Sequence, residues 1–197
     1  VIGMDEKPGV ALRAKPGASI PVGIGCVRGG EAGAFISMGN TGAVVGAATL
    51  GLGTLEGVRR PGIAITTHMT GRPVTILDMG ANVVPKPAHL LHYALMGSTL
   101  ASDVDGIENP RVGLLNIGEE ASKGTDLLRA AHQLLSESHL NFVGNVEAGE
   151  IFGKDVDVVV TDGFTGNVFL KTLEGLSSFM LTQVTQQLDA HQAGWGE

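Results

Sequence analysis

The sequence is poor in cysteine, in aromatic side chains and in long apolar runs. Its one cysteine, Cys26, excludes an intrachain disulfide and a cysteine pair for a metal ion. Aromatic residues make up 4% of the 197 residues. The longest apolar segment, Ala43 to Leu55, is rich in glycine and too short to span a bilayer. These absences argue against a disulfide-stapled secreted domain and a transmembrane protein, and we expect a cytoplasmic location.

Positive charge is also scarce. The chain has 13 Lys and Arg against 20 Asp and Glu, which gives a net charge of −7 at pH 7. The summed field of such a chain repels phosphate polymers, so we expect no nucleic-acid partner. Local basic positions can still bind small anions.

Aliphatic residues and glycine are abundant. Hydrophobic residues reach 43% and glycine accounts for 30 positions. A core built from these residues is aliphatic and tightly packed, with close approaches between backbone segments. This composition favours an α/β architecture over a β-sandwich.

Five segments repeat one pattern, in which a short aliphatic run leads into a loop of Gly, Asn, Asp and Thr and then into a helical pattern. The pattern predicts βα units around a mostly parallel sheet, within a single α/β domain over residues 1–197. The predicted strands are Ala34 to Ser37, Val74 to Asp78, Arg111 to Asn116, Leu140 to Val143 and Val156 to Thr161, and the loops that follow are 39–42, 79–82, 117–124, 144–147 and 162–167. A further strand, Gly62 to Thr67, turns back near Thr70-Gly71 and is a candidate antiparallel neighbour.

Apolar spacing predicts the helices. Leucines and Ala131 fall on one helical face between about Thr125 and Glu137, with Thr125 as N-cap. A longer stripe from Phe169 to Leu188 predicts a long helix that begins just after Asn167. A helix over Pro21 to Gly33 is the weakest of these predictions, because each of its glycines costs about 1 kcal/mol relative to alanine.

The loops should share one edge of the sheet. Ligands of open α/β sheets bind at the carboxyl ends of the strands, where glycine lets backbone amides converge and helix N-termini favour anions. We therefore expect a pocket for phosphate. Its predicted binding residues are Gly39, Asn40, Thr41, Gly42, Asp78, Gly80, His89, Asn116, Gly118, Asn145, Asp162, Thr165 and Gly166.

Each loop also has a purely structural interpretation. Asn40 or Thr41 could simply cap a helix, and so could Asp78. Lys123 could hold phosphate as a point charge or be an ordinary solvated lysine. His89 and His92 share a helix face but lack a third ligand, so we expect no metal ion.

No arrangement of a protein nucleophile with its base is recognisable in the sequence. A reaction in which phosphate itself attacks a thioester fits better, since the protein then only holds the reactants together and donates hydrogen bonds to the oxyanion. We assign this role to Asn82, Lys123 and Asn167, and we expect no cofactor.

Six segments in order resemble the signature segments of the acyl carrier protein:phosphate acyltransferase (PlsX) family. They are Asp5-Glu6-Lys7-Pro8, Ser37-Met38-Gly39-Asn40-Thr41-Gly42-Ala43, Leu77-Asp78-Met79-Gly80-Ala81-Asn82, Gly113-Leu114-Leu115-Asn116-Ile117-Gly118, Asn141-Phe142-Val143-Gly144-Asn145-Val146-Glu147 and Val160-Thr161-Asp162-Gly163-Phe164-Thr165-Gly166-Asn167-Val168. The resemblance implies a three-layer α/β/α fold, isopropylmalate-dehydrogenase-like and related to phosphotransacetylases. It also implies a homodimer that makes acyl phosphate from acyl carrier protein and inorganic phosphate for phospholipid synthesis, with peripheral membrane association.

The family is longer at both ends, so the chain resembles the central part of a longer fold. Two alternatives stay open: a phosphotransacetylase-like enzyme that uses acyl-coenzyme A, and a non-catalytic remnant that binds an anion or a partner. For the acidic carrier, we predict docking near Arg59, Arg60 and Arg72.

Overall fold

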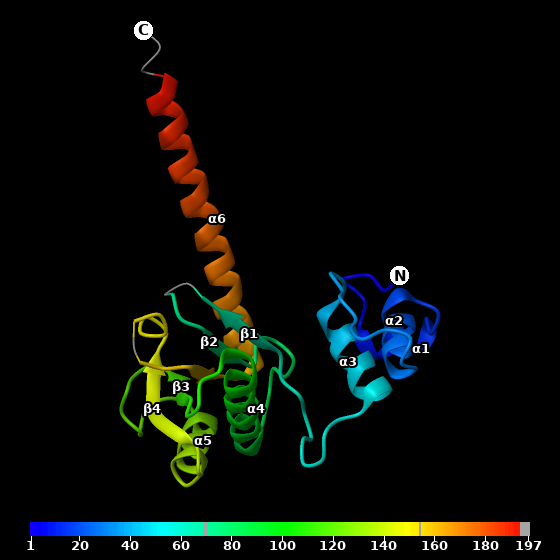
Figure 1. The fold of residues 1–197 in the computed structure, drawn as a ribbon, viewed down its shortest axis with the longest axis horizontal. Coiled ribbons are helices and arrows are strands. Elements are labelled where there is room, and N and C mark those ends of the chain that lie inside the picture. The colour runs from blue at the N-terminus through cyan, green and yellow to red at the C-terminus, as the bar shows by residue number, and fades with distance from the viewer. Residues whose placement is uncertain (69–70, 154, 194–197) are drawn as a thin grey trace. The chain divides into compact units, whose positions relative to one another are not determined.

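The computed structural model describes residues 1–68, 71–153 and 155–193. The chain forms two compact units, Val1–Ile63 and Ala64–Glu197, and each is described by itself (Figure 1). The single domain over residues 1–197 stays a prediction.

The first unit is a group of three helices, α1 (Pro8–Ala14), α2 (Ser19–Arg28) and α3 (Thr41–Leu52). Small side chains let these helices approach closely: a Cβ on Gly42 would lie 2.6 Å from Pro8 Cγ. Its buried core consists of Ile2, Ala11, Ala18, Ile20, Ile24, Ala43 and Ala47. The weakly predicted helix is thus real as α2, although it ends at Arg28 and does not reach Gly33.

The predicted strand Ala34 to Ser37 is wrong. None of the residues of the first unit, all of which the structure describes, forms a strand, so this segment has no partner within its unit for ladder hydrogen bonds. Its side chains are used differently. The ring of Phe35 lies against Gly23 of α2, and Ile36 is 90% exposed.

The second unit contains a five-stranded sheet in the order β1-β2-β5-β3-β4. The strands are β1 (Ala64–Thr67), β2 (Val74–Leu77), β3 (Arg111–Asn116), β4 (Asn141–Glu147) and β5 (Val158–Val160). The last four are parallel to one another, whereas β1 pairs antiparallel with β2, as expected. The predicted turn at Thr70-Gly71 lies partly outside the described residues, which do not include Thr70.

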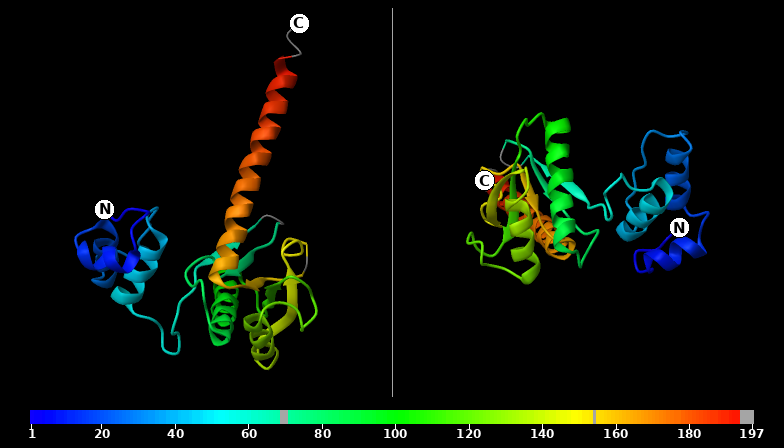
Figure 2. Two further views of the ribbon diagram at one scale, coloured as in Figure 1. Left: turned by 180° about the vertical axis from the view of Figure 1, so that it is seen from behind. Right: turned by 90° about the horizontal axis from the view of Figure 1, so that it is seen from below.

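Three helices cover this sheet: α4 (Pro87–Asp105), α5 (Asp126–Ser136) and α6 (Gly163–Ala193). Helices α4 and α5 contact each other and share a core with Leu77 and Leu114 on one face (Figure 2). Side chains alternate along a strand, so Leu115 points to the other face, where it lies near the first turns of α6. This arrangement confirms the predicted α/β/α layers.

In the second unit, two boundaries differ from the sequence prediction by more than two residues. Residues 144–147, expected as a loop, belong to β4, because a bulge at Val143 and a positive φ of 95° at Gly144 let the strand continue. Helix α6 begins at Gly163 and not after Asn167, because the side chain of Asp162 accepts the first helical amides.

Helix α6 starts beside the sheet and runs on beyond it (Figures 1 and 2). Its side chains from Glu174 to Leu188 are exposed. No helix in the described part of the chain is both long and apolar enough to cross a membrane.

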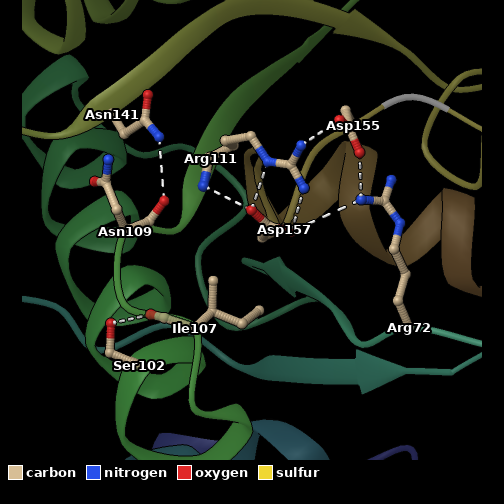
Figure 3. A network of polar contacts seen from close by, with 8 residues as sticks. All are labelled: Arg72, Ser102, Ile107, Asn109, Arg111, Asn141, Asp155 and Asp157. Carbon is tan, nitrogen blue, oxygen red and sulfur yellow. Dashed lines mark hydrogen bonds and ion pairs between the residues drawn. The ribbon is translucent and has the colours of Figure 1, made fainter.

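The amino ends of β3 and β5 are joined by ion pairs (Figure 3). Asp157, 5% exposed, accepts hydrogen bonds from Arg111 N at 2.8 Å, Nε at 2.9 Å and Nη2 at 3.0 Å. Arg72 and Arg111 each also contact Asp155. Burial alone would raise the pKa of Asp157, but the hydrogen bonds and charge of Arg111 outweigh it and hold that pKa below its ordinary value.

Replacing Asp157 should remove an acid-sensitive part of the stability. A lowered pKa stabilises the fold above the unfolded value of about 3.9, and this stability is lost as the pH falls through the folded-state pKa. We expect Asp157→Asn to lower the free energy of unfolding by about 2 kcal/mol at pH 7. We also expect the free energy of unfolding to fall less steeply with decreasing pH, which is the acid branch of its pH dependence. Urea unfolding from pH 2 to 7 measures both effects. Asp126→Asn, which removes a pair on the exposed surface of α5, is the control and should match the wild type. An unchanged acid branch in Asp157→Asn would contradict the account.

Candidate active site

The turns after β2, β3 and β5 lie at one edge of the sheet, because these neighbouring strands are parallel. They begin at Asp78, Ile117 and Thr161. The edge therefore gathers most of the polar residues that the sequence predicts for the site.

The turn after β2 is organised by a buried carboxylate. Asp78 has no exposed surface and accepts hydrogen bonds from the amides of Gly80 at 3.2 Å, Ala81 at 2.9 Å and Asn82 at 2.7 Å. The side-chain amide of Asn82 donates to the same carboxylate at 3.2 Å. The amides of this turn were expected to bind phosphate. They bind the carboxylate of Asp78 instead.

The first turn of α6 packs directly on this turn. Gly163 N donates to Asn82 O at 2.9 Å, and a Cβ on Gly166 would lie only 2.0 Å from Asp78 O. A Cβ on Gly80 would lie 3.5 Å from Asn167 Cβ. The structure thus brings together Asp78, Gly80, Asn82, Gly166 and Asn167.

Asp162 has the corresponding role at α6. Its Oδ1 accepts from the amides of Phe164 at 3.0 Å and Thr165 at 2.9 Å, and its Oδ2 accepts from the Thr165 hydroxyl at 2.7 Å. Asp162 therefore caps the helix, and its charge is compensated by local donors.

The loop after β3 is held by two asparagines. Asn116 donates to Lys123 O at 3.2 Å and accepts from Ile117 N at 2.8 Å, and Asn145 of β4 donates to Glu120 O at 2.8 Å. The Asn145 Oδ1 atom is buried without a hydrogen-bond partner in the described structure. Gly118, beside the Lys123 stem, belongs to the same loop. Thr125 caps α5, as predicted.

Two groups at this edge remain available to a ligand. Lys123 and Asn167 are exposed, and no hydrogen bond or ion pair within the described residues occupies the Lys123 amine or the Asn167 side-chain amide. Of the three residues assigned to catalysis, Asn82 is instead 8% exposed and tied to Asp78.

The remaining predicted residues have structural contacts. His89 Nδ1 accepts from Lys86 N at the start of α4. In the first unit, Asn40 caps α3 by accepting from Ala43 N at 3.0 Å and donates to the carbonyls of Gly3 and Glu6. Gly39 N donates to Ser37 Oγ, and Thr41 and Gly42 begin α3.

A cavity of about 640 Å³ opens beside the β3 and β5 turns. Its described lining residues are Leu115, Asn116, Ile117, Gly124, Thr125, Leu128, Ala148, Asp162, Thr165, Val168, Phe169 and Thr172. The sequence analysis did not assign a site role to its apolar members. The helical stripe through Phe169 was the available signal, but the sequence analysis used it only to predict a helix.

The chain has close relatives of known family. A family model described as "Fatty acid synthesis protein" matches residues 1–197. The chain belongs to this family. A phosphate acyltransferase from Desulfitobacterium hafniense strain DSM 10664 / DCB-2 is 47% identical over 191 residues, which cover 96% of this chain and 57% of that protein. One from Dehalococcoides mccartyi strain BAV1 is 51% identical over 172 residues, covering 87% and 50%. The chain thus spans about half the length of these phosphate acyltransferases.

Solved structures show the same fold at low identity. A phosphotransacetylase from Streptococcus pyogenes matches with a TM-score of 0.60 and 19% identity, covering 80% of this chain and 54% of that one. The EutD phosphotransacetylase from Staphylococcus aureus matches with a TM-score of 0.57 and 19% identity, covering 80% and 55%. The expected relation of the fold to phosphotransacetylases is confirmed.

Asp78→Asn should loosen the turn after β2. The amide nitrogen of the new side chain faces backbone N–H donors and leaves at least one of them without an acceptor. We therefore expect the free energy of unfolding to fall by about 1–3 kcal/mol. Hydrogen exchange should report faster opening at residues 80–82. Asp162→Asn is the matched control, because asparagine caps helices about as well as aspartate. Unchanged protection at residues 80–82 in Asp78→Asn would refute this role.

Gly166→Ala should destabilise the second unit strongly, because its Cβ would overlap the carbonyl oxygen of Asp78. Gly175 lies in the same helix with nothing within 4 Å of its Cβ position, so Gly175→Ala should stabilise by up to about 1 kcal/mol. Thermal unfolding of the two variants compares them. Equal melting temperatures would contradict the close packing of α6 on the Asp78 turn.

Proposed function

We propose that the whole protein that contains this chain transfers a fatty acyl group from acyl carrier protein to inorganic phosphate, giving acyl phosphate for phospholipid synthesis. The observation that carries the proposal is that the turns at one sheet edge hold two polar groups without a hydrogen bond or ion pair among the described residues, those of Lys123 and Asn167, and that a largely apolar cavity, which neither residue lines, opens at the same edge. The family and its phosphate acyltransferase relatives support it.

In the proposed reaction, a phosphate oxygen attacks the thioester carbonyl carbon. A carbon–oxygen bond forms, the carbon–sulfur bond breaks, and the carrier leaves as a thiolate that takes up a proton. Lys123 would hold the phosphate as a cation, and the Asn167 amide would donate to the oxyanion of the tetrahedral intermediate. Holding both reactants in place can replace several kcal/mol of entropic barrier, roughly 7–11 at best.

The two aspartates at this edge do not oppose an anion as free carboxylates would. Asp78 and Asp162 are surrounded by the amides that they accept from, so their charges are largely compensated. Their proposed role is to position: Asp78 holds the turn against which Asn167 lies, and Asp162 fixes the start of α6. The phosphate would then meet Lys123 and Asn167 first.

Homodimer formation and peripheral association with the cytoplasmic membrane are part of the same proposal. The exposed apolar residues of α6, among them Phe179, Met180 and Val184, support an interaction surface on this helix. Docking of the acidic carrier at Arg72 lacks support, because its guanidinium pairs with Asp155 at 2.9 Å.

Turnover by the whole protein tests the function. Acyl carrier protein thioester and phosphate should give acyl phosphate, detected by trapping with hydroxylamine. Lys123→Ala and Asn167→Ala should each lower kcat/KM by about 10²-fold, as is typical of lost oxyanion or anion contacts, with little change in melting temperature.

Lys171→Ala is the matched control, because Lys171 is an exposed lysine of α6 that pairs with Glu174 at 2.7 Å. Its activity should equal that of the wild type. Preference for acyl-coenzyme A would favour a phosphotransacetylase-like enzyme, whereas phosphate binding without turnover would favour a non-catalytic protein.

A further inference from the structure

The cavity beside the β3 and β5 turns is lined by one face of α6 and by residues of α5 and β3. Its α6 side is formed by Thr165, Val168, Phe169 and Thr172, which follow the i, i+3, i+4, i+7 spacing of one helix face. Leu128 contributes from α5, and Leu115 and Ile117 from the end of β3. From Thr165 to Thr172 the helix rises by about 10 Å. The cavity therefore extends along α6 away from the turns.

Polarity changes along this cavity. Asn116, Asp162 and Thr165 belong to the turns and to the first turn of α6, where the proposed reaction takes place. The other lining side chains are mostly apolar, among them Val168 and Phe169, with Thr172 the last polar one along α6. A ligand that fits this lining has a polar reacting group at the turn end and a hydrocarbon body.

The lining also excludes other ligand classes. Asp162 is the one ionisable group among the described lining residues, and its two oxygens accept from Thr165 and Phe164. Without a cation the interior does not suit a phosphate, and with the single aromatic ring of Phe169 it offers little for a nucleotide base to stack on. The volume of about 640 Å³ is within the usual range of about 300–1,000 Å³ for small-molecule sites.

We propose, on the basis of the proposed function, that this cavity holds the hydrocarbon chain of the acyl thioester and that Val168 and Thr172 set its preferred length. The thioester carbonyl lies at the turn end, near Asn116 and Thr165, and the chain runs along α6 past Thr172. Thr172 and Val168 are exposed residues of α6 and do not belong to the buried core of the described structure.

Thr172→Trp in the whole protein tests the assignment, because it fills the far part of the cavity. With hexadecanoyl carrier protein, we expect kcat/KM to fall at least about tenfold, since a few displaced methylenes already give such a factor. With hexanoyl carrier protein, kcat/KM should stay within about twofold of the wild type, since a short chain does not reach position 172.

Leu176→Trp is the matched control. It places the same side chain one turn farther along the same face of α6, outside the cavity. Its ratio of long-chain to short-chain kcat/KM should equal that of the wild type. Equal losses for both chain lengths in Thr172→Trp, or the same change of ratio in Leu176→Trp, would overturn the proposal while leaving the proposed function intact.

A binding measurement separates the cavity from the reaction. Titration with a fluorescent polyene fatty acid should show saturable binding to the wild type and to Leu176→Trp, and at least about tenfold weaker binding to Thr172→Trp. If the wild type makes no acyl phosphate from either thioester but this pattern is found, the proposed function fails and the hydrocarbon site stands. If the probe does not bind to the wild type, the hydrocarbon site is refuted.

Discussion

The carboxyl edge of the sheet depends on one buried carboxylate. Asp78 gathers three consecutive backbone amides behind β2, and the compact turn that results is the surface on which α6 begins. Only glycine fits at position 166 against the Asp78 carbonyl. The position of Asn167, and with it the α6 side of the cavity, follows from this contact. An electrostatic interaction within five residues thereby determines the geometry of a site assembled from three separate turns.

Much of the second unit could be predicted from the sequence, because its signals are local. The strands around β2, β3 and β5 appear as aliphatic runs, and the spacing of leucines gives α5 with its Thr125 cap. The failures concern features that depend on a neighbour. The segment Ala34 to Ser37 has strand-like residues but no partner strand in its unit, and β4 passes through Gly144 because pairing with β3 continues beyond the bulge.

The sequence predicted which polar residues meet at the sheet edge better than it predicted what those residues contact. Polar residues after the strands do meet at one edge, yet Asp78, Asp162 and Asn116 satisfy backbone groups of their own turns. Sequence alone cannot decide between these roles, since a side chain that caps a turn and one that binds a ligand are the same residue types. The apolar stripe of α6 shows the converse limit: its periodicity reveals a packing face, but the cavity on that face arises from how α6 lies relative to β3.

Strand β5 is short and uniform in sequence, which affects how its register with β2 and β3 is fixed. Its ladder consists of Val158, Val159 and Val160, three identical side chains, so sliding the strand along β2 and β3 would exchange valine for valine. The strand itself therefore carries almost no information about alignment. The register is instead fixed at the two ends of the strand. At one end Arg111 donates hydrogen bonds to Asp157, and at the other Gly163 N donates to Asn82 O. The register of the central strand is therefore fixed by two contacts outside its ladder, an ion pair at one end and a backbone hydrogen bond at the other.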